Sequence, residues 1–207
     1  SRIRSVNIFF DNYTKVNDVI ENYRQYVGEA HFFRAWYYFQ LVEKYGDVPW
    51  YGEQILPNEE DKLLRPRDSR TVVIDSIISD LDRAKEYLHL KSEVGNLRIN
   101  KETALAFKTR VALYEGSWQK YHSNTNFGTS GADPNKYLEE CILAATELIS
   151  GDEYLADLFP NYRELFGLDD MTGVDEVFLY RAYSIADGFS NDVNYTILQP
   201  GELGVTW

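Results

Sequence analysis

Residues 28–45 constrain the fold most, because they predict a helix with apolar or aromatic side chains on nearly every side. The stretch contains no proline and is followed by Gly46, a residue suited to a helix end. Its apolar members are Ala30, Phe32, Phe33, Ala35, Trp36, Tyr37, Tyr38, Phe39, Leu41 and Val42. Such a helix must be covered by several neighbours. One candidate is an earlier helix at about residues 2–19, which carries Ile3, Val6, Phe9 and Phe10.

Three further stretches show the apolar spacing i, i+3, i+4, i+7 that indicates amphipathic helices. They cover residues 70–88, 101–121 and 134–150. Suitable N-cap residues precede them at Ser69, Asn100 and Asp133, and Pro134 fits the first helical position of the third. The apolar stripe predicted for the third helix comprises Leu138, Cys141, Ile142, Ala145, Leu148 and Ile149. We expect Gly151 to end that helix in the left-handed conformation.

The order of these elements predicts a mainly α fold of stacked helical hairpins, similar to tetratricopeptide repeats in an α-α superhelix. The 34-residue tetratricopeptide consensus is not legible, so this prediction rests on element order alone. After Gly151 the helical pattern ends, and one or two short strands are predicted, most clearly at Glu176–Tyr180. We therefore expect a tetratricopeptide-like helical domain at residues 1–151 and the start of a loop-rich, truncated second region at residues 152–207.

The charge distribution argues against two classes of partner. The chain has a formal net charge of −12, with 22 acidic and 19 basic residues in 1–150 and 11 acidic against two basic residues in 151–207. Duplex phosphates and anionic lipid surfaces would be repelled. Charged residues interrupt every apolar stretch before about 18 residues, so no transmembrane helix is predicted. We therefore expect no nucleic acid partner and no direct membrane contact.

Residue types and spacings give no indication of catalysis, a metal or a cofactor. His31, His89 and His122 lie far apart, without the spacing of a zinc site. Cys141, the only cysteine, is expected to be a buried, inert thiol. No glycine-rich nucleotide-binding or nucleophile motif occurs. The densest group of carboxylates is Asp169, Asp170, Asp175 and Glu176, which leaves a glycosidase-like acid–base pair as an open alternative.

Aromatic residues fall into two groups with different predicted roles. Those at helical spacing are expected in the core, namely Phe32, Trp36, Phe39, Phe107 and Trp118. Others lie in loops, and near the end of the chain they occur beside amides and acids. A ring can stack on the C–H groups of a sugar while amide and carboxylate groups bind its hydroxyls. The candidate glycan-binding residues are Asn191, Asp192, Asn194, Tyr195 and Trp207. The alternative is that these side chains pack beneath an irregular domain.

The run GEAHFFRAWYYFQLVEKYGDVPWYGE at residues 28–53 resembles a motif of the SusD/RagB family of Bacteroidetes outer-membrane lipoproteins. The family pattern is EA-x-F-x-RA-x-x-Y-F-x-L-V-x-x-YG-D-x-P. Three more blocks follow in the family's order, at residues 67–84, 100–116 and 154–178. Because four ordered blocks agree, the chain is identified as similar to an N-terminal or internal portion of such a protein.

This resemblance implies a fold of tetratricopeptide-type hairpins and a function without catalysis. SusD-like proteins bind oligosaccharide or polysaccharide and act as a lid on a SusC-like TonB-dependent transporter. They lie on the extracellular face of the outer membrane, held by a lipidated N-terminal Cys that is expected outside this chain. The glycan-contacting loops of the family are expected partly outside it too. The matched residues Glu29 and Arg34 look structural, either paired with each other or bound to loop backbone.

Three functions follow, in decreasing order of support. The first is a non-catalytic glycan-binding component of a SusC/SusD-like nutrient-uptake complex. The alternative is a protein–protein interaction scaffold whose helical hairpins bind a peptide or a partner chain. The third is a glycoside hydrolase, which the absence of a recognisable acid–base signature disfavours.

Overall fold

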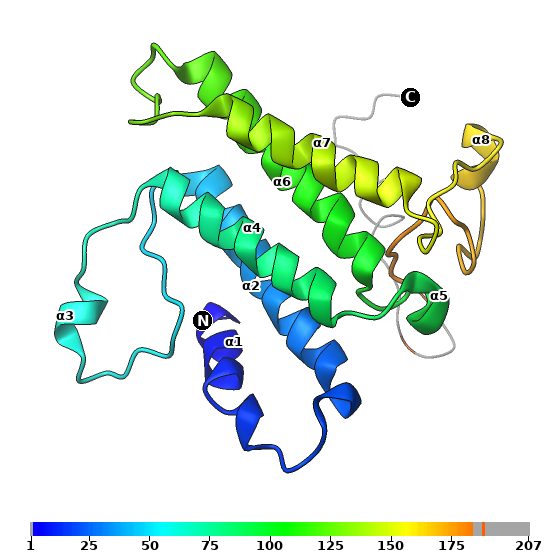
Figure 1. Cartoon of the computed structure of the whole chain (residues 1–207), viewed down its shortest axis with the longest axis horizontal. Helices are drawn as coiled ribbons and strands as arrows, with labels where there is room; N and C mark the ends of the chain where they lie inside the picture. Colours follow the sequence, from blue (N-terminus) through cyan, green and yellow to red (C-terminus); the bar gives the residue numbers. More distant parts are fainter. Residues whose placement is uncertain (1, 184–187, 189–207) are drawn as a thin grey trace.

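The computed structural model describes residues 2–183 and Gly188, and this part of the chain is mainly helical (Figure 1). The longer helices are α1 (Arg2–Phe10), α2 (Arg24–Tyr45), α4 (Arg70–Tyr87), α6 (Lys101–His122) and α7 (Pro134–Ser150). Single-turn elements lie between and after them at η1 (Tyr13–Lys15), η2 (Ile20–Asn22), α3 (Glu60–Leu63), α5 (Lys91–Val94) and α8 (Tyr162–Leu165). The prediction of a mainly α fold is confirmed, although α1 is shorter than expected.

The long helices form two stacked hairpins. α2 packs on α4, α4 contacts α6, and α6 packs along α7, while α1 lies against α2. Figure 1 shows α2, α4, α6 and α7 side by side, with chain direction alternating from each to the next. The arrangement of stacked hairpins predicted from element order is therefore confirmed.

The core is built where α2, α4 and α6 meet. Phe107 of α6 lies beside the rings of Phe32, Trp36 and Phe39 of α2, at centroid distances of 5.5, 4.9 and 5.6 Å. Each such aromatic pair contributes about 0.5–1.5 kcal/mol beyond the area it buries. Phe32, Phe39 and Phe107 are buried as predicted, whereas Trp36 and Trp118 are only half-buried.

The three predicted N-caps are confirmed. The side chains of Ser69, Asn100 and Asp133 accept hydrogen bonds from backbone N–H groups in the first turns of α4, α6 and α7. The prediction for Gly151 is wrong, because its φ of −76° is not left-handed. A Cβ at Gly151 would lie 2.6 Å from the Tyr154 ring, so close packing explains this glycine.

Gly28, the first residue of the helix predicted at residues 28–45, lies inside α2, which begins at Arg24. A Cβ there would lie 2.8 Å from Leu88 Cγ and 2.9 Å from the Leu88 backbone nitrogen. This glycine therefore permits the close approach of α2 to the end of α4. Gly46 does end α2, with a left-handed φ of 71°.

The predicted apolar stripe of α7 is only partly correct. The structure buries Tyr137, Ala144 and Leu148 against α6, whereas Ile142 and Ile149 are 63% and 74% exposed. Cys141 is half-buried rather than buried. Two adjacent faces of α7 are apolar, and its packing on α6 decides which of them is covered.

The predicted strand at Glu176–Tyr180 is wrong, since the described residues there form turns and irregular structure. The backbone carbonyl of Phe178 accepts hydrogen bonds from the side chains of Asn100 and Thr103, and the Tyr180 N–H donates to the Asn96 carbonyl. Because two side chains and one backbone carbonyl from residues 96–103 satisfy these backbone groups, the segment needs no neighbouring strand.

Candidate functional site

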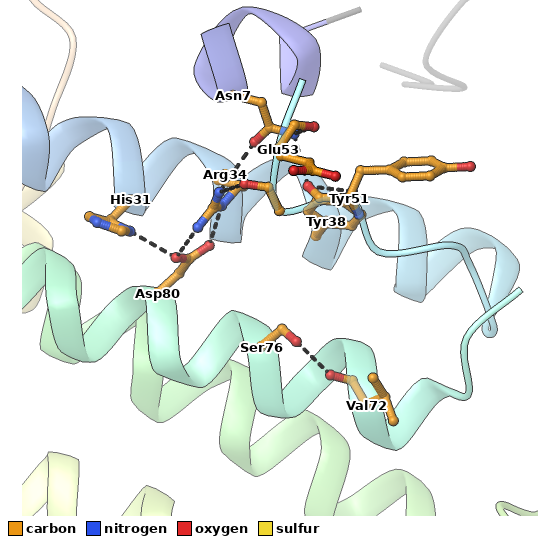
Figure 2. A network of polar contacts seen from close by, with 10 residues as sticks. Asn7, His31, Arg34, Tyr38, Tyr51, Glu53, Val72, Ser76 and Asp80 are labelled. Carbon is orange, nitrogen blue, oxygen red and sulfur yellow. Dashed lines mark hydrogen bonds and ion pairs between the residues drawn. The ribbon is translucent and has the colours of Figure 1, made fainter. Parts of the chain in front are cut away.

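A buried polar network joins α1, α2, α4 and the loop after α2 (Figure 2). We call Asn7, His31, Arg34 and Asp80 the Arg34 network. Asp80 of α4 binds Arg34 of α2 through two hydrogen bonds of 2.7 Å and lies 2.8 Å from His31 Nδ1. All four side chains are buried. The hydrogen bonds of the network thus take the place of the water that would otherwise solvate this buried ion pair.

The same arginine fixes the loop at residues 50–53. Arg34 Nη1 donates to the Gly52 carbonyl at 3.1 Å and to Asn7 Oδ1 at 3.2 Å. Asn7 Nδ2 in turn donates to the carbonyls of Tyr51 and Glu53, at 2.8 and 2.9 Å (Figure 2). Arg34 therefore binds loop backbone, which is one of the two roles predicted for it.

Glu29, the other motif residue, does not pair with Arg34. It forms a salt bridge with Arg98 and accepts a hydrogen bond from Gln25. The loop aromatic Trp50 packs with its ring centroid 4.1 Å from that of Tyr38, so this loop ring belongs to the packed structure.

Asp80 remains ionised in this network. Burial alone would raise its pKa, but the hydrogen bonds and charges of Arg34 and His31 outweigh burial and hold the pKa of Asp80 below its usual value. The aspartate therefore acts as a fixed anion that positions the side chains of Arg34 and His31.

A groove opens on another part of the bundle, between α2, α6 and residues 97–99 and 178–182. We call it the α2–α6 groove. Its volume of about 890 Å³ lies within the range of small-molecule sites. The aromatic residues lining it are Phe32, Phe33, Trp36, Phe107, Phe178 and Tyr180. The charged residues lining it are Glu29, Arg98, Arg110 and Arg181.

Polar contacts hold the 178–182 wall of this groove in place. Asn100, the N-cap of α6, donates to the Phe178 carbonyl at 2.9 Å. Asn96 donates to the Met171 carbonyl at 2.7 Å, and Lys91 Nζ donates to the Asp175 carbonyl at 2.8 Å. The wall is therefore attached to the helical layer through the connection between α4 and α6.

The arginines of the groove differ in how they are paired. Arg98 is neutralised by Glu29 and lies over the Tyr26 ring at 4.9 Å. Among the described residues, no carboxylate pairs with Arg110 or Arg181, although Arg181 lies over the Tyr183 ring at 5.2 Å. Three arginines against one glutamate give the lining a formal charge of +2. This surface is cationic within an acidic chain.

The groove continues along α6 into a second hollow of about 650 Å³. The two hollows share Ala106 and Arg110. Trp118 lines the second, with the His122 ring stacked on it at 4.0 Å. Arg110 therefore lies where two aromatic-lined hollows meet.

The sequence-predicted glycan-binding residues lie outside the described residues. These are Asn191, Asp192, Asn194, Tyr195 and Trp207. Sequence reasoning missed the α2–α6 groove. The available signal was the helix at residues 28–45, because its all-round apolar surface includes Phe33 and Trp36, which the other helices leave partly exposed.

The acidic cluster after α8 is engaged in local turns. Asp170 accepts hydrogen bonds from Thr172 and from the Tyr180 hydroxyl, and these lower the pKa of Asp170. Glu176 accepts a hydrogen bond from the Phe159 N–H at 2.7 Å. Both carboxylates therefore stabilise the segment in which they lie.

The described residues contain neither a metal-binding cluster nor a membrane-spanning helix. No group of three or more His, Cys, Asp and Glu side chains in this part of the chain could hold a metal ion. Within the same residues, each helix is too short or too polar to cross a bilayer.

Comparison with known proteins gives matches in both sequence and structure. SusD-like protein P38 of Formosa agariphila is 33% identical over 95 residues, covering 46% of this chain and 18% of that protein. A SusD-like protein of Bacteroides fragilis superposes with a TM-score of 0.57 and 27% identity, over 75% of this chain and 26% of its own. A laminarin-binding SusD-like protein superposes with a TM-score of 0.67 and 22% identity, over 90% of this chain and 36% of its own.

These relatives are longer than the chain described here, which spans 18–24% of the curated relatives that it matches. The sequence pattern of the SusD-like family, described as "Starch-binding associating with outer membrane", matches residues 1–113. That match includes α2, α4 and the first half of α6, the helices that form the core. This chain belongs to the SusD-like family.

Proposed function

We propose that this protein is a non-catalytic glycan-binding component of an outer-membrane nutrient-uptake complex. It binds an oligosaccharide or polysaccharide on the extracellular face, where a lipid anchor holds the full-length protein. It passes the ligand to a SusC-like TonB-dependent transporter. The observation that carries this proposal is the family match over residues 1–113, because that family is described as starch-binding and associated with the outer membrane.

Structural neighbours support the ligand class. One is a laminarin-binding SusD-like protein, and another was crystallised with a xylogluco-oligosaccharide, with a TM-score of 0.63 and 20% identity. Their common feature with this chain is the helical fold. Stacked helices provide a rigid frame, and loops that extend from such a frame commonly carry binding specificity. We keep Asn191, Asp192, Asn194, Tyr195 and Trp207 as the proposed glycan contacts.

Glycan binding is tested by titrating the full-length protein with laminarin, xyloglucan oligosaccharides and soluble starch in a calorimeter. We expect at least one of them to bind, and the Tyr195→Ala and Trp207→Ala variants to bind it more weakly. Tyr162→Ala is the matched control, because Tyr162 is a 75% exposed aromatic residue on α8 and is not one of the proposed contacts. If all three variants bind the glycan equally well, the assignment of Tyr195 and Trp207 as contacts is wrong. If the unmodified protein binds no glycan at all, the proposed function is contradicted.

The transporter partnership needs a separate test. Affinity purification of the full-length protein from detergent-solubilised outer membranes is expected to recover a TonB-dependent transporter in stoichiometric amount. Recovery of the protein alone, under conditions that preserve other outer-membrane complexes, would contradict this partnership.

A protein-interaction scaffold is the second candidate function. The observation that favours it is the uncovered apolar face of α7, on which Ile142 and Ile149 are exposed. Such faces are typical of protein contacts. Capture of a partner without binding of any glycan would favour this function. A glycoside hydrolase would require sustained turnover that is lost on mutation of Asp169, Asp170 or Glu176.

A further inference from the structure

We propose that the α2–α6 groove binds an acidic saccharide, with Arg110 and Arg181 pairing with its carboxylate groups. This inference rests on the proposed glycan-binding function and adds to it a site and a ligand class. The groove is lined by other residues than the proposed contacts at residues 191–207, namely by residues of α2, α6 and the segments 97–99 and 178–182.

The groove presents aromatic surface that is already held in place. The Trp36 ring lies 4.9 Å from that of Phe107 and 6.3 Å from that of Phe32. Phe33, one residue before the buried Arg34, remains 39% exposed at the groove. Because packing already fixes Trp36, a ligand loses little free energy in ordering this surface. The C–H faces of a pyranose ring can lie against such rings.

The charges of the groove select an anion. Glu29 is the carboxylate of the lining, and Arg98 and Gln25 already bind it. Arg110 and Arg181 have no carboxylate partner among the described residues. A guanidinium presents a planar pair of donors that matches a carboxylate, and such charge-assisted hydrogen bonds are about twice as strong as neutral ones. A neutral glucan would leave this interaction unused.

A saccharide fits the groove better than a peptide strand. α2 and α6 contribute much of the lining, and their backbone donors and acceptors are used within each helix. The lining segments at residues 97–99 and 178–182 form no strand, so the groove offers no sheet edge for strand addition. The lining instead offers aromatic ring faces, which can contact the C–H groups of a uronate, and guanidinium groups, which can pair with its carboxylate.

The test compares an acidic and a neutral probe on the intact protein by calorimetry. The probes are trigalacturonate and laminaritriose. We expect trigalacturonate to bind, and the Arg110→Gln/Arg181→Gln double variant to weaken this binding by about tenfold or more. Binding is expected to weaken as NaCl rises from about 0.05 to about 0.5 M, because salt screens the ion pairs.

Arg83→Gln is the matched control, because Arg83 is an exposed arginine on α4 and does not line the groove. It is expected to bind trigalacturonate like the unmodified protein. Phe33→Ala is a second variant of the same groove, and it leaves the number of positive charges unchanged. It is expected to weaken trigalacturonate binding.

The outcomes separate this inference from the proposed function. If the double variant binds trigalacturonate as well as the unmodified protein, or if only neutral glycans bind, the site assignment fails and glycan binding stands. If neither neutral nor acidic glycans bind, the proposed function fails as well. Binding of an acidic peptide with the same dependence on Arg110 and Arg181, in the absence of saccharide binding, would overturn the ligand class.

Discussion

The Arg34 network and the α2–α6 groove use arginine in opposite ways. Arg34 is buried, and it is bound by Asp80, Asn7 and a loop carbonyl. Arg110 is exposed and has no carboxylate partner among the described residues. A buried guanidinium must be fully paired because its desolvation is costly, whereas an exposed one is solvated by water and stays available to a ligand. The first arginine therefore holds the fold together, and the second can serve recognition.

The largest effect is expected from Asp80→Ala, which removes the anion at the centre of the Arg34 network. The change leaves the Arg34 guanidinium buried without its main partner, and we expect a loss of about 3–5 kcal/mol in the free energy of unfolding. Urea denaturation followed by circular dichroism measures it. Lys62→Ala is the control, because its salt bridges with Glu53 and Glu59 are exposed and their loss should change stability little. A loss for Asp80→Ala no larger than that of the control would contradict the comparison.

The same aspartate gives a pH dependence of known sign. The pKa of Asp80 is lower in the folded protein than in the unfolded chain, because Arg34 and His31 stabilise its anion. Its stabilisation is therefore present above the unfolded pKa of about 3.9 and is lost as pH falls through the lower, folded-state pKa. The stability difference between the unmodified protein and Asp80→Asn should shrink below about pH 4. A difference that grows with acidity would contradict this assignment.

The second effect in size concerns the two apolar faces of α7. Leu148→Ala removes a side chain buried against α6 and should cost about 2–4 kcal/mol. Ile149→Ala, the neighbouring exposed position, should change stability by about 0.5 kcal/mol or less. Equal losses in urea denaturation would mean that the face carrying Ile149 is covered in solution.

A smaller effect is expected from Gly28→Ala, where the added Cβ would collide with Leu88. Overpacking lowers the free energy of unfolding by about 1–3 kcal/mol, whereas the better helix propensity of alanine raises it by about 1 kcal/mol. We expect a net loss of about 1 kcal/mol in thermal or urea unfolding. Gly52→Ala is the control, since a Cβ there meets only Trp50 Nε1, at an ordinary 3.6 Å. A more stable Gly28→Ala variant would show that α2 and α4 can separate at little cost.

The smallest effect is expected on the groove side. The Arg110→Gln/Arg181→Gln variant should unfold within about 0.5 kcal/mol of the unmodified protein, because neither charge is paired with a carboxylate in the described structure. Its thermal unfolding, measured beside that of Asp80→Ala, tests the contrast directly. A large loss of stability would show that these arginines also hold the fold together.

Local features of the fold could be predicted because they depend on residues close together in sequence. Ser69, Asn100 and Asp133 each bind a backbone N–H three residues later. The first residues of α4, α6 and α7 can therefore be predicted from the sequence. The failed strand at Glu176–Tyr180 shows the opposite case. Its backbone is satisfied by Asn96, Asn100 and Thr103, which lie about 80 residues earlier. The boundary at residue 151 between two regions stays a prediction.

The candidate site depended still more on tertiary structure. The resemblance at residues 28–53 indicated that Arg34 was structural, but its partner Asp80 lies on another helix. Arg110 lies in the helix predicted at residues 101–121 and Arg181 in the region predicted to be loop-rich, and neither position marks a binding residue in the sequence. Only the packing of α2 on α6, with the 178–182 segment beside them, brings these residues to one groove.

The sequence by itself determined the long helices α2, α4, α6 and α7, the N-caps of the last three, the family, and the need to cover residues 28–45 on several sides. Periodicity and short-range hydrogen bonds are sufficient for this, because a helix is built from contacts three and four residues apart. The tertiary structure alone decided which apolar face of α7 is buried. It also decided that Arg34 is buried and paired, whereas Arg110 is exposed to a ligand. Those outcomes depend on which helices pack against each other. This packing joins residues far apart in the sequence, so neither periodicity nor short-range spacing predicts it.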